Sequence, residues 1–125
     1  MADVNLLAAW LGILLGSLAG AIQGLFFRRE DWLGGYGSWR RRMLRLGHIS
    51  FFGLGFVNLG FALSVRVLEI DDGIVWSSRL FILGAVTMPL LCYLSSVKDV
   101  FRYLFFIPVL SVIAGSAIFL EVLLR

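Results

Sequence analysis

Four long apolar stretches constrain the fold of this 125-residue chain more than any other feature of its sequence. A helix needs about 20 predominantly apolar residues to cross the hydrocarbon core of a bilayer. Stretches of that length cover residues 5–27, 46–65, 80–97 and 103–124. Because lipid offers no hydrogen-bond partners to the backbone, such stretches are helical. The sequence therefore predicts an all-α integral membrane protein that folds as an antiparallel four-helix transmembrane bundle.

The composition agrees with this class. Hydrophobic residues make up 60% of the chain and charged residues 15%. An average soluble domain is about 45–50% apolar and about 25% charged. Because the four stretches occupy most of the chain, we expect a single membrane domain over residues 1–125 and no separate soluble module.

The distribution of lysine and arginine predicts an orientation. Cytoplasmic loops of membrane proteins carry an excess of these residues. Residues 28–45 and 98–102 together hold eight of them, whereas the opposite side holds only Arg66, Arg79 and Arg125. We therefore expect both basic loops in the cytoplasm and both termini outside, with a bacterial inner membrane as the expected location. Because the basic residues lie beside apolar stretches, they indicate lipid headgroups rather than nucleic acid.

The first stretch contains a glycine at every fourth position, namely Gly12, Gly16, Gly20 and Gly24. On a helix these glycines share one face and form a groove about 18 Å long. Small residues allow close approach between helices in lipid. This glycine zipper predicts tight helix packing, with another helix of the chain, another subunit or a flat cofactor in the groove.

Polar residues inside the stretches predict a candidate ligand pocket in the inner leaflet. Intramembrane polar groups usually face the interior of a bundle and are often functional. The candidate ligand-binding residues are Gln23, His48, Asn58, Cys92, Tyr93 and Ser95. Hydrogen bonding between helices is the alternative role for this set.

His48 is the only histidine, and it allows several roles. It is suited to a structural hydrogen bond, a bond to a quinone or a lipid headgroup, axial ligation of a porphyrin, or a proton relay. One histidine cannot form a bis-histidine haem site within one chain, although two copies can. The single cysteine, Cys92, excludes an intrachain disulfide and a cysteine-based zinc site. No metal site is predicted, and the cofactor stays unknown.

The loop over residues 28–45 combines aromatic residues with arginines. Tryptophan and tyrosine favour the membrane interface, and arginine favours anionic headgroups. Aromatic residues beside arginine are also typical of protein–protein interfaces. The residues expected to dock on lipid or on a partner are Trp32, Tyr36, Trp39, Arg40, Arg41 and Arg42.

Three functional hypotheses follow from these features. No nucleophile–base pair or metal-ligand spacing is present, so we do not expect an enzyme. The first hypothesis is a small accessory or structural subunit of a larger inner-membrane complex of respiratory or photosynthetic type. The second is a homo-oligomeric channel or transporter that uses Asn58, Thr87 and Ser111. The third is an electron-transfer protein that binds haem or quinone through His48.

Overall fold

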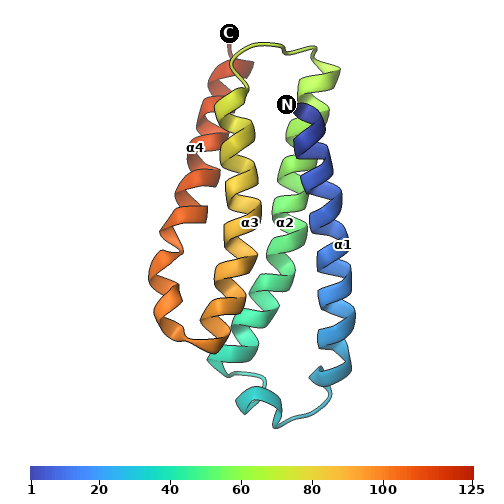
Figure 1. Ribbon diagram of the computed structural model, residues 1–125, viewed down its shortest axis with the longest axis vertical. Coiled ribbons are helices and arrows are strands. Elements are labelled where there is room, and N and C mark those ends of the chain that lie inside the picture. Colours follow the sequence, from blue (N-terminus) through green and yellow to red (C-terminus); the bar gives the residue numbers. More distant parts are fainter.

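The computed structural model describes residues 1–125, and it is all-helical. The long helices are α1 (Ala2–Phe27), α2 (Trp39–Val67), α3 (Val75–Val97) and α4 (Phe106–Leu123), and the short 3-10 helices are η1 (Trp32–Gly34) and η2 (Asp99–Leu104). Consecutive long helices run in opposite directions along the long axis (Figure 1). Four helical segments are long and apolar enough to cross a membrane, the last of which includes η2 and α4.

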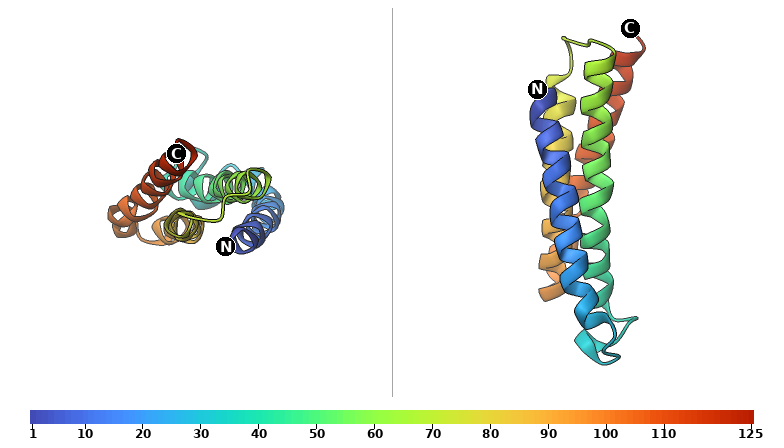
Figure 2. Two further views of the ribbon diagram at one scale, coloured as in Figure 1. Left: turned by 90° about the horizontal axis from the view of Figure 1, so that it is seen from above. Right: turned by 90° about the vertical axis from the view of Figure 1, so that its right-hand side faces the viewer.

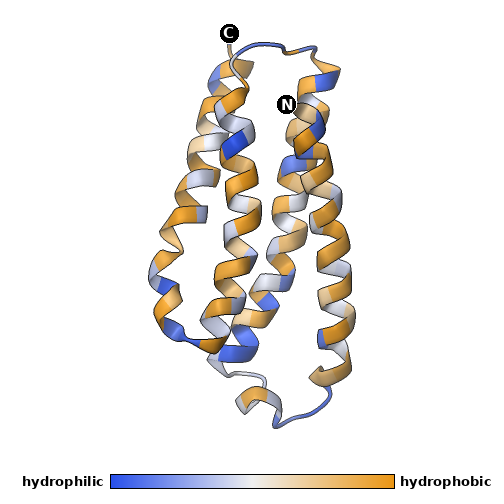
Figure 3. Ribbon diagram, in the orientation of Figure 1, coloured by the Kyte–Doolittle hydropathy of each residue, from blue (hydrophilic) through white to orange (hydrophobic).

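The two ends of the molecule differ. One end holds both termini and the connection over residues 68–74 (Figure 1), and we call it the terminal end. The other end holds residues 28–45 and 98–105, and we call it the basic end. Figure 3 shows apolar residues along all four long helices and hydrophilic residues gathered toward the two ends.

The helices are not packed symmetrically. Helices α1, α2 and α3 pack on one another, whereas α4 packs mainly on α3. Viewed from above, α1 and α4 lie on opposite sides of the molecule (Figure 2). Only 17% of the most apolar part of α1, and 17% of that of η2 and α4, is buried. The remaining apolar surface is suited to lipid rather than to water.

A small apolar core joins three helices at the terminal end. Phe61 of α2 packs against Phe81 of α3, with ring centroids 5.3 Å apart, and against Phe119 of α4, at 4.8 Å. Val65 and Ile74 are buried in the same cluster. These contacts fix the distance between α2, α3 and α4 at that end.

Helix α2 begins earlier than the apolar stretch at residue 46 predicts. Ser38 has an extended backbone (φ −63°, ψ 151°), and its hydroxyl accepts a hydrogen bond from the N–H of Arg41 at 3.3 Å. Serine is a preferred residue at this capping position. The helix therefore starts at Trp39, and residues 39–45 form its first two turns instead of a loop. Only residues 28–38 connect α1 to α2.

Of the four regularly spaced glycines of α1, Gly12, Gly16 and Gly20 contact α2. A Cβ atom on Gly12 would lie 3.0 Å from the carbonyl oxygen of Phe51, and one on Gly16 would lie 2.9 Å from the Phe52 ring. A Cβ on Gly20 would overlap the His48 imidazole. A helix of the same chain therefore fills the groove at these positions. Gly24 differs, because no atom lies within 4 Å of its Cβ position.

Candidate functional site

A buried polar cluster links three helices in the half of the molecule near the terminal end. Asn5 donates from Nδ2 to Asn58 Oδ1 at 2.8 Å and to the carbonyl oxygen of Ser78 at 3.3 Å. Asn58 donates from Nδ2 to the carbonyl oxygens of Leu54 at 2.9 Å and Phe81 at 3.2 Å. The Ser78 hydroxyl donates to Asn5 Oδ1. Because every polar atom of the two amides has a partner, the cluster is a structural device that fixes helix register.

This cluster separates Asn58 from the other candidate ligand residues. Its partners Asn5 and Ser78 are the fourth residues of α1 and α3, so the cluster lies toward the terminal end. The expectation that Asn58 belongs to a pocket near the basic end is therefore corrected. Thr87 donates to the carbonyl oxygen of Leu83 in its own helix, at 2.6 Å. Ser111 likewise donates to the carbonyl oxygen of Pro108, at 2.9 Å. Neither hydroxyl hydrogen-bonds to Asn58.

Four candidate ligand residues lie near the basic end, in the interior between α1, α2 and α3. They are Gln23, Cys92, Tyr93 and Ser95. Gln23 Nε2 donates to the hydroxyl of Tyr93 at 2.7 Å and so bridges α1 to α3. Cys92 is fully buried beside Gly47 of α2. A Cβ atom added to Gly47 would lie 3.2 Å from the Cβ atom of Cys92. Ser95 is buried one turn of α3 further on. Gln23 Oε1 and the Ser95 hydroxyl are buried without a hydrogen-bond partner.

His48 lies at a different interface, between α1 and α2. Its Nδ1 is 2.9 Å from the carbonyl oxygen of Gly16. Because a carbonyl oxygen only accepts hydrogen bonds, Nδ1 carries the proton. In the neutral imidazole, Nε2 then keeps a lone pair, and it has no hydrogen-bond partner in the chain. The edge of Phe52 packs against the ring, with centroids 5.4 Å apart. His48 is thus held in one tautomer, as histidines that bind metals usually are.

The most distinctive contact at the basic end is made by Arg41, which is 1% exposed. Its guanidinium donates to the carbonyl oxygens of Phe27 at 2.9 Å and Arg29 at 3.3 Å. It also lies 5.0, 5.5 and 5.8 Å from the ring centroids of Phe27, Trp32 and Tyr36. Arg41 therefore donates hydrogen bonds to carbonyls at the C-terminal end of α1. A positive charge at that end also interacts favourably with the helix dipole.

The burial of Arg41 corrects its expected role in lipid or partner docking, because its charge is not available at the surface. Its neighbours make related bonds. Trp39 Nε1 donates to the carbonyl oxygen of Ser95, and Arg40 Nε donates to that of Ser96, both at 3.0 Å. Three consecutive residues at the start of α2 thus hydrogen-bond the C-terminal ends of α1 and α3. Arg42 makes no such bond and is exposed.

The loop held by Arg41 presents an ordered surface. Leu33 has a positive φ of 52°, and Gly34 and Gly35 have φ values of 86° and 94°. Glycine adopts this left-handed region without the steric cost that a side chain brings. The loop displays Tyr36 at 70% exposure. Arg45 Nη1 donates to the Tyr36 carbonyl oxygen at 2.9 Å, and its guanidinium lies 4.2 Å from the centre of the Tyr36 ring.

Comparisons with protein-family models, with curated proteins and with solved structures find no match to this chain. No group of three or more histidine, cysteine or acidic side chains is placed to hold a metal ion. The geometry of the basic end and of His48 is therefore what bears on function.

Proposed function

We propose that the chain spans a membrane as an antiparallel four-helix bundle, in a location such as the bacterial inner membrane. The length and apolar surface of the four helical segments support this placement. We place the basic end in the cytoplasm and both termini outside, because the lysines and arginines gather at the basic end.

We further propose that the protein is a small accessory subunit of a larger membrane complex, and that it docks through residues 28–38. The buried Arg41 is the observation that carries this proposal. Removing a guanidinium from water is unfavourable, and here two carbonyl bonds and three aromatic rings offset part of that effect, while Nε is buried without a partner. The result is a loop whose shape is set before any partner binds. Anchoring in fluid lipid headgroups does not require a fixed shape, whereas preorganisation lowers the entropic cost of binding a protein.

The exposed Tyr36, stacked against Arg45, is suited to be the centre of this docking surface. Tyrosine and arginine are enriched among the residues that dominate binding energy at interfaces. Because the Arg45 bond fixes the Tyr36 backbone, little freedom is lost when the ring is covered.

A native mass spectrum of the protein extracted gently from its source membrane tests the proposal. We expect the chain to emerge with other polypeptides, and Tyr36→Ala to reduce that complex about tenfold or more, as expected for a central interface tyrosine. Tyr103→Ala is the control, because Tyr103 is equally exposed at the same end but lies outside the loop. A chain that emerges alone as a defined homo-oligomer would contradict the proposal.

His48 favours haem or quinone binding as a second candidate function. Its oriented imidazole and its unpaired Nε2 are suited to ligate a porphyrin iron or to accept a hydrogen bond from a quinol. The same mass spectrum separates the two candidates, because this one requires an added mass of haem or quinone that is lost in His48→Phe. No comparable observation favours a homo-oligomeric channel.

A further inference from the structure

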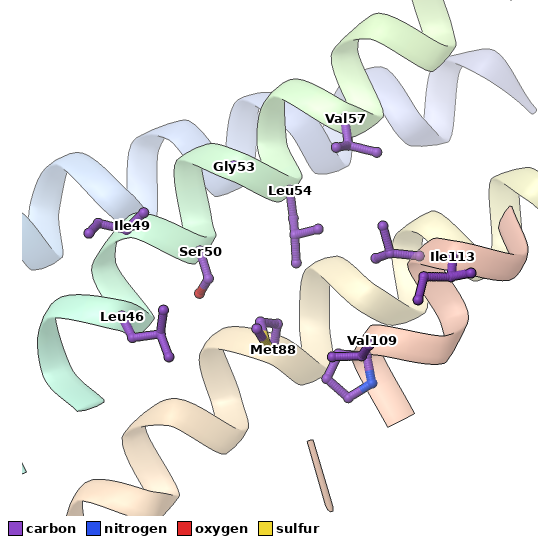
Figure 4. Close-up of a pocket in the computed structure, with 11 residues that line it drawn as sticks. Leu46, Ile49, Ser50, Gly53, Leu54, Val57, Met88, Val109 and Ile113 are labelled. Atoms are coloured by element: carbon purple, nitrogen blue, oxygen red, sulfur yellow. The ribbon is translucent and has the colours of Figure 1, made fainter. Parts of the chain in front are cut away.

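An apolar groove with a volume of about 480 Å³ runs between α2 and α4 (Figure 4). It exists because both helices pack on α3 while contacting each other little. Met88 of α3 lines its floor. Its walls include Leu46, Ile49, Gly53 and Val57 of α2, together with Val109 and Ile113 of α4.

The length of the groove corresponds to one leaflet of a bilayer. Leu46 and Val57 are 11 residues apart on α2, which corresponds to about 16 Å. Half of a hydrocarbon core about 30 Å thick is about 15 Å. Leu46 lies about 10 Å along α2 from its first residue, Trp39. The groove therefore lies in the leaflet nearest the basic end.

The groove is lined mostly by apolar side chains, and its volume of about 480 Å³ accommodates a single hydrocarbon chain. Apolar side chains offer such a chain no hydrogen bonds and require none, so an acyl chain is a suitable occupant.

Positive charges lie at the basic end of the molecule, beyond the end of the groove that Leu46 lines. Arg42 is exposed one turn before Leu46, on the same face of α2. Arg102 of η2 lies over the Trp39 ring, 5.9 Å from its centre, and so stands beside the start of α2. Lys98 and Asp99 are also exposed in this connection. These four charged residues sum to +2, which favours an anionic headgroup.

We propose that this groove binds one acyl chain of an anionic phospholipid, whose phosphate contacts Arg42 and Arg102. The site rests on the membrane placement proposed above and is independent of the accessory-subunit role. It assigns the apolar groove and the adjacent charges to a single ligand, a lipid of the leaflet at the basic end.

Titration of the purified protein in detergent micelles with phosphatidylglycerol or phosphatidylcholine, read by native mass spectrometry, tests this site. Gly53→Leu places a side chain at the wall of the groove, where no atom lies within 4 Å of the Cβ position. We expect it to weaken phosphatidylglycerol binding about tenfold, since displacing about two methylenes has that effect. Gly60→Leu is the matched control, because Gly60 is equally open on α2 but does not line the groove. We expect the affinity of Gly60→Leu for phosphatidylglycerol to lie within about twofold of the wild-type affinity.

Arg42→Gln tests the headgroup contact separately. We expect about fivefold weaker binding of phosphatidylglycerol, as for one cation near an anionic headgroup. The loss for phosphatidylcholine should be smaller, because its choline cation balances the phosphate charge. Unchanged thermal unfolding of each variant would show that the fold is intact.

Two results would overturn the site, namely equal effects of Gly53→Leu and Gly60→Leu, or equal affinity of the wild-type protein for the two lipids. Release of the chain from membranes by alkaline carbonate would instead contradict the membrane placement itself. Loss of a partner in Tyr36→Ala would leave the lipid result unchanged.

Discussion

Replacement of Arg41 by alanine is expected to lower the free energy of unfolding by about 2–4 kcal/mol. The change removes two hydrogen bonds to the C-terminal end of α1 and leaves the carbonyl oxygens of Phe27 and Arg29 without these donors. It also opens a space among the rings of Phe27, Trp32 and Tyr36. Equilibrium unfolding of the purified protein in micelles, followed by circular dichroism, measures the effect.

Arg42→Ala is the matched control for Arg41→Ala. Arg42 is the next residue of the same helix and has the same charge, but it is exposed. We expect its replacement to change the free energy of unfolding by no more than about 0.5 kcal/mol. Equal losses in the two variants would show that net charge, rather than the buried contacts of Arg41, stabilises the basic end.

The second large effect is expected from Gly20→Leu. Overpacking should lower the free energy of unfolding by about 1–3 kcal/mol. A Cβ at this position overlaps the His48 imidazole, so the ring has to move or α1 has to separate from α2. Either response breaks the bond between His48 Nδ1 and the Gly16 carbonyl oxygen. The same unfolding measurement reports the loss.

Gly24→Leu supplies the comparison for Gly20→Leu. Both glycines lie on α1, one turn apart, but the Cβ position of Gly24 has no atom within 4 Å. We expect the free energy of unfolding of Gly24→Leu to lie within about 0.5 kcal/mol of the wild-type value. If the two substitutions destabilise the protein equally, α2 does not pack against Gly20 as closely as described.

The sequence predicts the four helices well because hydropathy and length determine which segments are suited to span lipid. It predicts the start of α2 poorly. Residues 39–45 include four arginines, and a hydropathy pattern cannot show that a helix continues beyond the apolar region. The serine cap at Ser38 was the available local signal, since serine commonly precedes the first turn of a helix.

The candidate site depends on contacts between distant parts of the chain. Asn58 looks like an isolated polar residue in its apolar stretch, because its partner Asn5 is 53 residues away. Arg41 looks like one member of a basic surface run, because its partners belong to the end of the preceding helix and to the intervening loop. The sequence shows which polar residues are present, but it does not show that Asn58 pairs with Asn5 or that Arg41 bonds the end of α1.

Cysteine labelling of intact cells tests the placement of the chain most directly. The native Cys92 is fully buried, so its background labelling is expected to be low. Gly37→Cys reports on the loop at the basic end, and Asp72→Cys reports on the exposed connection at the terminal end. We predict that a membrane-impermeant maleimide labels Asp72→Cys in intact cells and labels Gly37→Cys only after permeabilisation. Labelling of both positions in intact cells, or the reverse pattern, would contradict the account.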